Sequence, residues 1–158
     1  FGEQGPMTQA IIVILVTCGI VLASVSIHYE TLRLLTISLR RKNRWYSNRI
    51  RAGVLVLGCL TAHSLEVGLF GLGFQVLEYV HQGADLTGDI PDGFNCAYYS
   101  VVVYTSIGFG DVVPVSRPVR ILTAIEGLTG AILIAWTASF MFFHMQRFWK
   151  FGGDIGGD

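Results

Sequence analysis

The sequence is poor in charged residues, prolines and cysteines. Only 14% of its 158 residues are charged, whereas a soluble domain of this size carries about a quarter. The three cysteines, Cys18, Cys59 and Cys96, lie far apart and two fall inside apolar runs, so we expect buried thiols rather than disulfides or a metal site. The net charge is zero and we expect no nucleic-acid partner. No nucleophile, base or phosphate-loop pattern lies outside the apolar runs, so we expect neither an enzyme nor an organic cofactor.

Apolar runs long enough to cross a bilayer occupy most of the chain. About twenty such residues span the hydrocarbon core as a helix, and residues 8–27, 50–80 and 119–145 each meet this length. The first run has no arginine ladder of the kind found in voltage sensors, and we expect it to pack peripherally. Residues 28–39 carry leucines at helical spacing with charges between them, which predicts an amphipathic continuation lying near the membrane surface.

The most basic segment follows the first crossing. Lysine and arginine accumulate on the cytoplasmic side of membranes, so this segment predicts an N-terminus outside and a C-terminus in the cytoplasm, in the plasma membrane. It is either a solvated turn that touches lipid headgroups or a regulatory site for anionic lipid. The basic side chains concerned are Arg40, Arg41, Lys42 and Arg44, followed by Arg49 and Arg51.

A short apolar segment and a glycine-rich stretch lie between the last two crossings. Residues 94–105 are too short to cross a bilayer and predict a re-entrant helix. In residues 105–111, Gly108 and Gly110 alternate with apolar residues, and glycine tolerates positive φ, so successive carbonyls can turn the same way. Rings of such carbonyls replace the hydration shell of a cation, and Ser106 adds a hydroxyl oxygen at the inner end. The stretch therefore predicts a path for a monovalent cation.

This stretch resembles the selectivity-filter signature of potassium channels, Thr-Val-Gly-Tyr-Gly-Asp. It reads Tyr104-Thr105-Ser106-Ile107-Gly108-Phe109-Gly110-Asp111 and is followed by Pro114. The resemblance covers residues 50–147, the two-transmembrane pore module of tetrameric potassium channels. It implies a homotetramer, that is, this chain with three further copies of itself, conducting K⁺ passively, with K⁺ ions bound in the filter. The ion-binding residues it implies are Thr105, Ser106, Ile107, Gly108, Phe109 and Gly110.

The resemblance also assigns residues that support the filter. Tyr98 and Tyr99 fall where the family has an aromatic pair that braces the filter from behind. Val102 falls where several members have a glutamate that holds the filter aspartate, so Asp111 is expected to lack that partner. Ser106 stands where the signature has threonine, which leaves a weakly selective monovalent cation channel as the alternative function.

The inner helix carries the residues expected to bend and to close. Gly130 aligns with the glycine on which the inner helix of the family bends. Ile134, Ala138 and Phe142 share one helix face and are expected to line the inner pore. Phe142 either forms a hydrophobic constriction that gates by dewetting or packs between helices.

Three ionisable residues lie inside the apolar runs. Charged side chains at this depth cost about 2.5–3.5 kcal/mol, so His63, Glu66 and Glu126 are expected to have protein partners. His63 and Glu66 share a helix face and form either a structural pair or a pH- or metal-sensing site, which for a metal needs two or more further ligands. Glu126 is expected to bond the back of the pore helix near Tyr104 or Thr105, as support for the filter or as a modulator.

Together these features predict an all-α membrane protein. Each subunit has three transmembrane helices, a re-entrant pore helix and a filter loop, and four subunits form the pore. We expect an N-terminal crossing with a basic amphipathic elbow in residues 1–49, a pore domain in residues 50–147 and a flexible tail in residues 148–158. Two alternatives of other kinds are a metal-dependent membrane enzyme or sensor and a non-conducting membrane subunit.

Overall fold

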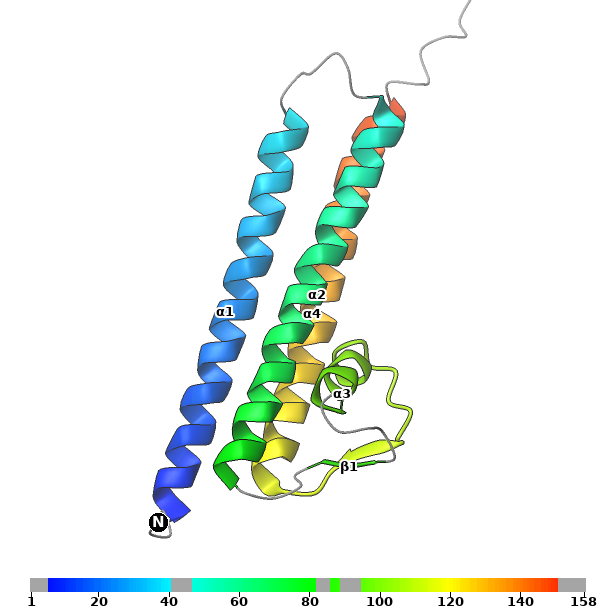
Figure 1. The fold of residues 1–158 in the computed structure, drawn as a ribbon. Coiled ribbons are helices and arrows are strands. Elements are labelled where there is room, and N and C mark those ends of the chain that lie inside the picture. The colour runs from blue at the N-terminus through cyan, green and yellow to red at the C-terminus, as the bar shows by residue number, and fades with distance from the viewer. Residues whose placement is uncertain (1–5, 41–46, 82–85, 89–94, 151–158) are drawn as a thin grey trace, which may run out of the picture.

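The described part of the protein consists of three long helices, one short helix and a two-stranded antiparallel sheet. The computed structural model describes residues 6–40, 47–81, 86–88 and 95–150. Figure 1 shows α1, α2 and α4 as long rods, with α3 and the two-stranded sheet set against the half of the bundle that contains the N-terminal end of α1. The elements are α1 Pro6–Arg40, α2 Asn48–His81, β1 Leu86–Gly88, α3 Asn95–Tyr104, β2 Val112–Pro114 and α4 Arg117–Lys150.

The three long helices are the membrane spans. Ile11–Leu39, Asn48–Val80 and Arg117–Gln146 are each long and apolar enough to cross a bilayer. Serine hydroxyls cap two of them, because Ser47 Oγ accepts from the amide of Ile50 and Ser116 Oγ accepts from that of Val119, each at 3.4 Å. The structure therefore has the helical membrane architecture that the sequence predicts.

Residues 28–39 continue the first crossing, as expected. Helix α1 is unbroken from Pro6 to Arg40. Leu32 and Leu35 are buried against Leu55 and Cys59 of α2, so the apolar side of this amphipathic pattern faces a helix. A Cβ at Gly58 would lie 2.6 Å from Leu35 Cδ2, so the missing side chain lets the two helices approach. The expected lipid site begins at Arg40, the last residue of α1. Arg41, Lys42 and Arg44 lie outside the described residues, whereas Arg49 and Arg51 lie in the first turn of α2.

A second apolar cluster joins the pore helix to the bundle. Phe74 of α2 and Tyr99 of α3 are buried with their ring centroids 5.1 Å apart at an interplanar angle of 70°. Val119 and Leu122 of α4 and Tyr104 of α3 complete this core. Helix α3 is thus fixed on its inner side by both α2 and α4, which sets the position of the loop that follows it.

The two-stranded sheet formed by β1 and β2 is not predicted from the sequence. β1 pairs antiparallel with β2, with Leu86 opposite Pro114 and Gly88 opposite Val112. β2 begins at Val112, directly after Asp111, so the glycine-rich stretch is held by α3 at one end and by a strand pair at the other. The rest of the loop between α2 and α3 lies outside the described residues, as do residues 151–158 of the expected tail, whereas residues 148–150 belong to α4.

Candidate functional site

The glycine-rich stretch has an alternating backbone. Ser106, Gly108 and Gly110 have φ values of 58°, 60° and 77°, so every second residue is in the left-handed region. Glycine adopts this region without steric cost, whereas a residue with a Cβ rarely does. The sequence points to the two glycines, but the left-handed conformation of Ser106 was not expected. Such non-glycine positions gather at ligand-binding sites, where the surrounding structure holds them in place.

The amides at the start of this stretch turn back toward the pore helix. Ile107 N and Gly108 N lie 3.0 and 3.4 Å from the carbonyl oxygen of Val102, and Ser106 N donates to Val103 O at 2.9 Å. These contacts satisfy the last carbonyls of α3, which a helix end otherwise leaves unpaired. Within the described chain, no backbone hydrogen bond of a turn or loop ends on a carbonyl oxygen of residues 105–110. Among the described turns and loops, the carbonyl oxygens of residues 105–110 are therefore free of backbone hydrogen bonds.

The outer end of the stretch is fixed at Asp111. Tyr98 Oη donates to Asp111 Oδ2 at 2.7 Å, and Asp111 Oδ1 accepts from the amide of Val112 at 3.1 Å. Val102 cannot supply the carboxyl partner that a glutamate would, and Tyr98 of the same helix supplies a hydrogen bond to Asp111 instead. This hydrogen bond to a carboxylate raises the pKa of Tyr98 above its ordinary value, because the anion is bound best by the protonated phenol.

The two adjacent tyrosines have different contacts. Tyr99 Oη lies 3.0 Å from Thr123 Oγ1 of α4, so this ring fastens the pore helix to the inner helix. Neighbouring residues of an α-helix point about 100° apart, which explains why Tyr98 reaches Asp111 and Tyr99 does not.

Two large apolar side chains of the stretch are uncovered in a single chain. Ile107 is 54% exposed and Phe109 is 68% exposed. They alternate with the left-handed residues and have no buried position within this subunit. Thr105 also belongs to the exposed stretch, and its hydroxyl donates to Val101 O at 2.6 Å.

The inner helix touches the pore helix closely at Gly130. A Cβ there would lie 2.3 Å from the carbonyl oxygen of Tyr104 and 3.1 Å from its Cα. Close packing against Tyr104 therefore requires a glycine at position 130. The resemblance implies only a bending role for this glycine, so the packing role is a new finding. Farther along α4, Ile134, Ala138 and Phe142 are all exposed in the single chain. They share the predicted face, on which Ile134 is 39% and Phe142 60% exposed.

Glu126 is buried and contacts the pore helix, as expected. Its Oε1 accepts from Ser100 Oγ at 2.5 Å. The expected partners were Tyr104 or Thr105, so the contact lies about one helical turn earlier in α3 than predicted. Ser100 Oγ also lies 2.8 Å from the carbonyl oxygen of Val67, which places this hydroxyl between α2 and α4.

A buried polar cluster lies behind the pore helix. Glu66 of α2 is fully buried, and its carboxylate lies 2.9 Å from His28 Nδ1 and 3.1 Å from His63 Nδ1. Tyr104 Oη also donates to Glu66. Thr137 Oγ1 of α4 lies 3.0 Å from His63 Nε2. The cluster thus joins all three long helices to the last residue of the pore helix.

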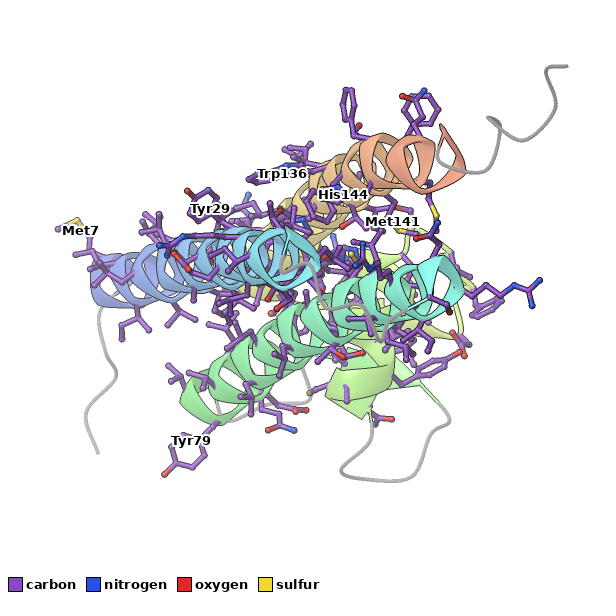
Figure 2. The ribbon with its side chains drawn as sticks, turned by 90° about the horizontal axis from the view of Figure 1, so that it is seen from above. Met7, Tyr29, Tyr79, Trp136, Met141 and His144 are labelled. Atoms are coloured by element: carbon purple, nitrogen blue, oxygen red, sulfur yellow. The ribbon has the colours of Figure 1, made fainter. Side chains whose placement is uncertain are left out.

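The sequence analysis predicts the His63–Glu66 contact but misses His28. His28 comes from α1, where it follows the apolar run and was assigned to a segment near the membrane surface. It is fully buried, and the ring of Trp136 lies against it with centroids 5.2 Å apart. Trp136 is labelled in Figure 2 on the side of α4 where Tyr29 of α1 also lies. A histidine on a helix face otherwise lined by Thr17 and Ser24, both buried, is the signal that could have identified it.

Comparison with known proteins identifies the family. A family model described as ion channel matches residues 63–147, more than half of the chain. The match begins at His63 in α2 and runs through α3, the filter stretch and most of α4, which is the two-transmembrane pore module, while α1 is an additional helix. Neither a curated protein nor a solved structure matches the chain. The chain is an integral membrane protein and belongs to the ion channel family.

Proposed function

We propose that the protein is a potassium channel in which the carbonyl oxygens of residues 105–110 bind K⁺ ions in transit. The observation that carries this proposal is the alternation of left-handed residues at Ser106, Gly108 and Gly110. This backbone lets successive carbonyls turn to one side, while the amides of Ile107 and Gly108 turn toward α3. Ordered carbonyls at short spacing are the ligands that replace the water around K⁺. Transport through such a loop is passive.

Four copies of the chain would complete the pore. Channels of this family are generally oligomeric, and each subunit supplies one wall of the filter. The exposed side chains of Ile107 and Phe109 support this arrangement, because apolar side chains next to a water-filled path need cover from a neighbouring subunit. The exposed face of Ile134, Ala138 and Phe142 would then line the inner pore. Phe142, 60% exposed in one chain, would form the constriction that closes it by dewetting.

The proposed orientation places the filter aspartate outside the cell, in the plasma membrane. The filter stretch and the two-stranded sheet lie toward the N-terminal end of α1 (Figure 1). The basic residues Arg49 and Arg51 lie in the first turn of α2, at the opposite end. The cytoplasmic preference of basic residues puts that end inside, with both the N-terminus and Asp111 outside. A reporter active only in the cytoplasm, fused after residue 158, is expected to be active, and an inactive fusion of an inserted protein would contradict this orientation.

Ion flux through purified protein in liposomes tests the channel function. With potassium on one side and sodium on the other, the reversal potential is expected to approach that of potassium. Gly108→Ala is expected to abolish conduction, because alanine resists a φ of 60° by about 1–2 kcal/mol. Gly68→Ala is the matched control, since a Cβ there meets nothing within 4 Å. Equal flux through both variants, or no flux through the unaltered protein, would refute the proposal.

Ser106 favours one second candidate, a weakly selective monovalent cation channel. Serine keeps the hydroxyl oxygen of the threonine in the signature but lacks its methyl group, and here it also adopts a φ of 58°. The innermost ion site would then be less tightly packed. A reversal potential near zero between potassium and sodium supports this candidate, and Ser106→Thr should then shift the potential toward that of potassium.

A further inference from the structure

The cluster behind the pore helix contains the donor atoms of a metal site. One ligand atom each from His28, His63 and Glu66 lies within 4.8 Å of the others. Two imidazoles and one carboxylate suit divalent first-row transition metals, whereas calcium and magnesium prefer oxygen alone. The sequence predicts the contact between His63 and Glu66 only. The third ligand, His28, comes from α1.

The hydrogen bonds of the metal-free cluster do not close. Both Nδ1 atoms face the Glu66 carboxylate, which only accepts, so each neutral imidazole must place its single N–H there. Both Nε2 atoms then need a donor. Thr137 Oγ1 lies 3.0 Å from that of His63 and 3.4 Å from that of His28, but a hydroxyl has one proton. Among the described groups, one buried imidazole nitrogen is left without a donor.

A metal ion bound to the two Nδ1 atoms removes this mismatch. Each Nε2 then carries the N–H, and the oxygen of Thr137 can accept from both with its two lone pairs. Histidine ligands of metals commonly donate their second N–H to such an outer oxygen, which fixes the ring. The ion would also balance the charge of Glu66, which is fully buried at membrane depth. One additional proton shared by the two imidazoles would meet the same count, so the experiment must separate the two.

The ligand atoms lie near the spacing that a tetrahedral ion requires, with a small closure needed. Zinc–nitrogen and zinc–oxygen bonds of about 2.0–2.2 Å place neighbouring ligand atoms about 3.3 Å apart. His28 Nδ1 lies 2.9 Å from Glu66 Oε1 and His63 Nδ1 lies 3.1 Å from Glu66 Oε2, whereas one ligand atom from each of the three residues lies within 4.8 Å of the others, so an ion would draw these atoms closer together. Tyr104 Oη donates to Glu66 and lies 2.9 Å from His63 Nδ1, so it borders the fourth position, which a water molecule would fill.

An entry path reaches the cluster from one side. His63 and Tyr104 line a groove of about 390 Å³ together with Thr105 and Ile134. The His63 side chain is 18% exposed, whereas His28 and Glu66 are closed off. Most of the groove lining comes from α2 and α3, with Ile134 from α4 and Thr105 from the start of the glycine-rich stretch.

We propose that His28, His63 and Glu66 form a binding site for a divalent transition metal such as Zn²⁺, and that its occupancy acts on the filter through Tyr104. Tyr104 ends α3 and is followed at once by Thr105, so a ligand that moves its hydroxyl moves the start of the filter. The effect on ion flux rests on the proposed channel function, whereas metal binding does not.

Equilibrium dialysis of the purified full chain against Zn²⁺, followed by elemental analysis, tests the site. One tightly bound ion per chain is expected, and His28→Gln and Glu66→Gln should each abolish it. Thr137→Val should weaken binding by about 10- to 100-fold, as loss of an outer-shell partner does. His144→Gln is the matched control, since this histidine contacts only the Phe140 carbonyl among the hydrogen bonds of the described chain, and it should bind as the unaltered protein does.

A measurement without substitution guards against variants that fail to fold. Co²⁺ bound to the unaltered protein should give the visible absorption of a tetrahedral site, and X-ray absorption should count two imidazole ligands. Zinc should change liposome flux of the unaltered protein and leave His28→Gln unaffected. Absence of a tight ion, an octahedral spectrum, unchanged binding in the cluster variants, or a cluster that responds to pH but binds no metal would each overturn the proposal.

Discussion

Replacing Gly130 by alanine is expected to displace the end of the pore helix. The added Cβ would lie 2.3 Å from the carbonyl oxygen of Tyr104, about 1 Å closer than atoms of these types tolerate, and both neighbours are backbone atoms that cannot rotate away. Overpacking of this kind costs about 1–3 kcal/mol. Alanine in a helix is favoured over glycine by about 1 kcal/mol, so the net effect is destabilising by about 0–2 kcal/mol.

Gly127→Ala is the matched control for this substitution. Gly127 lies one turn earlier in the same helix, and its added Cβ would meet Val103 at 3.9 Å, an ordinary contact. The same gain in helix propensity applies without the clash, so this variant should be as stable as the unaltered protein or more stable by up to about 1 kcal/mol. The two variants therefore differ in the sign of their expected effect.

Thermal unfolding in detergent and flux in liposomes measure the two variants side by side. Gly130→Ala should unfold at a lower temperature than Gly127→Ala and should conduct less, because Tyr104 directly precedes the filter stretch. If Gly130 acts only as a bending point of α4, the alanine variant should lose flux but keep its stability. Equal unfolding temperatures of the two variants would refute the packing argument.

Three further substitutions test other parts of the structure. Phe142→Ala should raise basal flux while Phe143→Ala, equally uncovered at 66% exposure, should not, and equal flux would argue against a constriction at Phe142. Phe74→Ala, in the buried cluster with Tyr99, should cost about 3–5 kcal/mol in thermal unfolding, and a loss below 1 kcal/mol would contradict the assigned core. Tyr98→Phe should shorten channel openings by freeing Asp111, without lowering the unfolding temperature appreciably, and unchanged openings would show that the 2.7 Å hydrogen bond does not hold the filter.

The features that the sequence predicts well are local ones. The length of an apolar run is enough to assign the crossings, and alternation of glycines around Phe109 is enough to predict positive φ at both. The His63–Glu66 contact follows from a spacing of three within one helix. Each of these inferences needs only residues that are neighbours in the chain.

The features that the sequence does not predict depend on contacts between distant segments. His28 and Glu66 are 38 positions apart, and nothing in either run shows that their helix faces meet. β1 pairs with β2 although the whole of α3 lies between them in the chain. Strands of three residues are too short to show an alternation of apolar and polar residues. Asp111 finds Tyr98 only because α3 and the filter fold back on each other. Ser106 looked like a change of side chain, whereas the structure also gives it an unusual backbone conformation.

Helix α1 has a consequence for how the chain enters the membrane. The buried carboxylate of Glu66 lies in α2, and its partner His28 lies in α1, which precedes α2 in the chain. A carboxylate that enters a bilayer alone bears the full insertion cost, whereas one that enters beside a waiting imidazole does not. α1 and α2 are therefore suited to insert as a pair. A pore module expressed without α1 would insert Glu66 with His63 of its own helix but without His28, so α1 supplies the second imidazole partner of this buried acid.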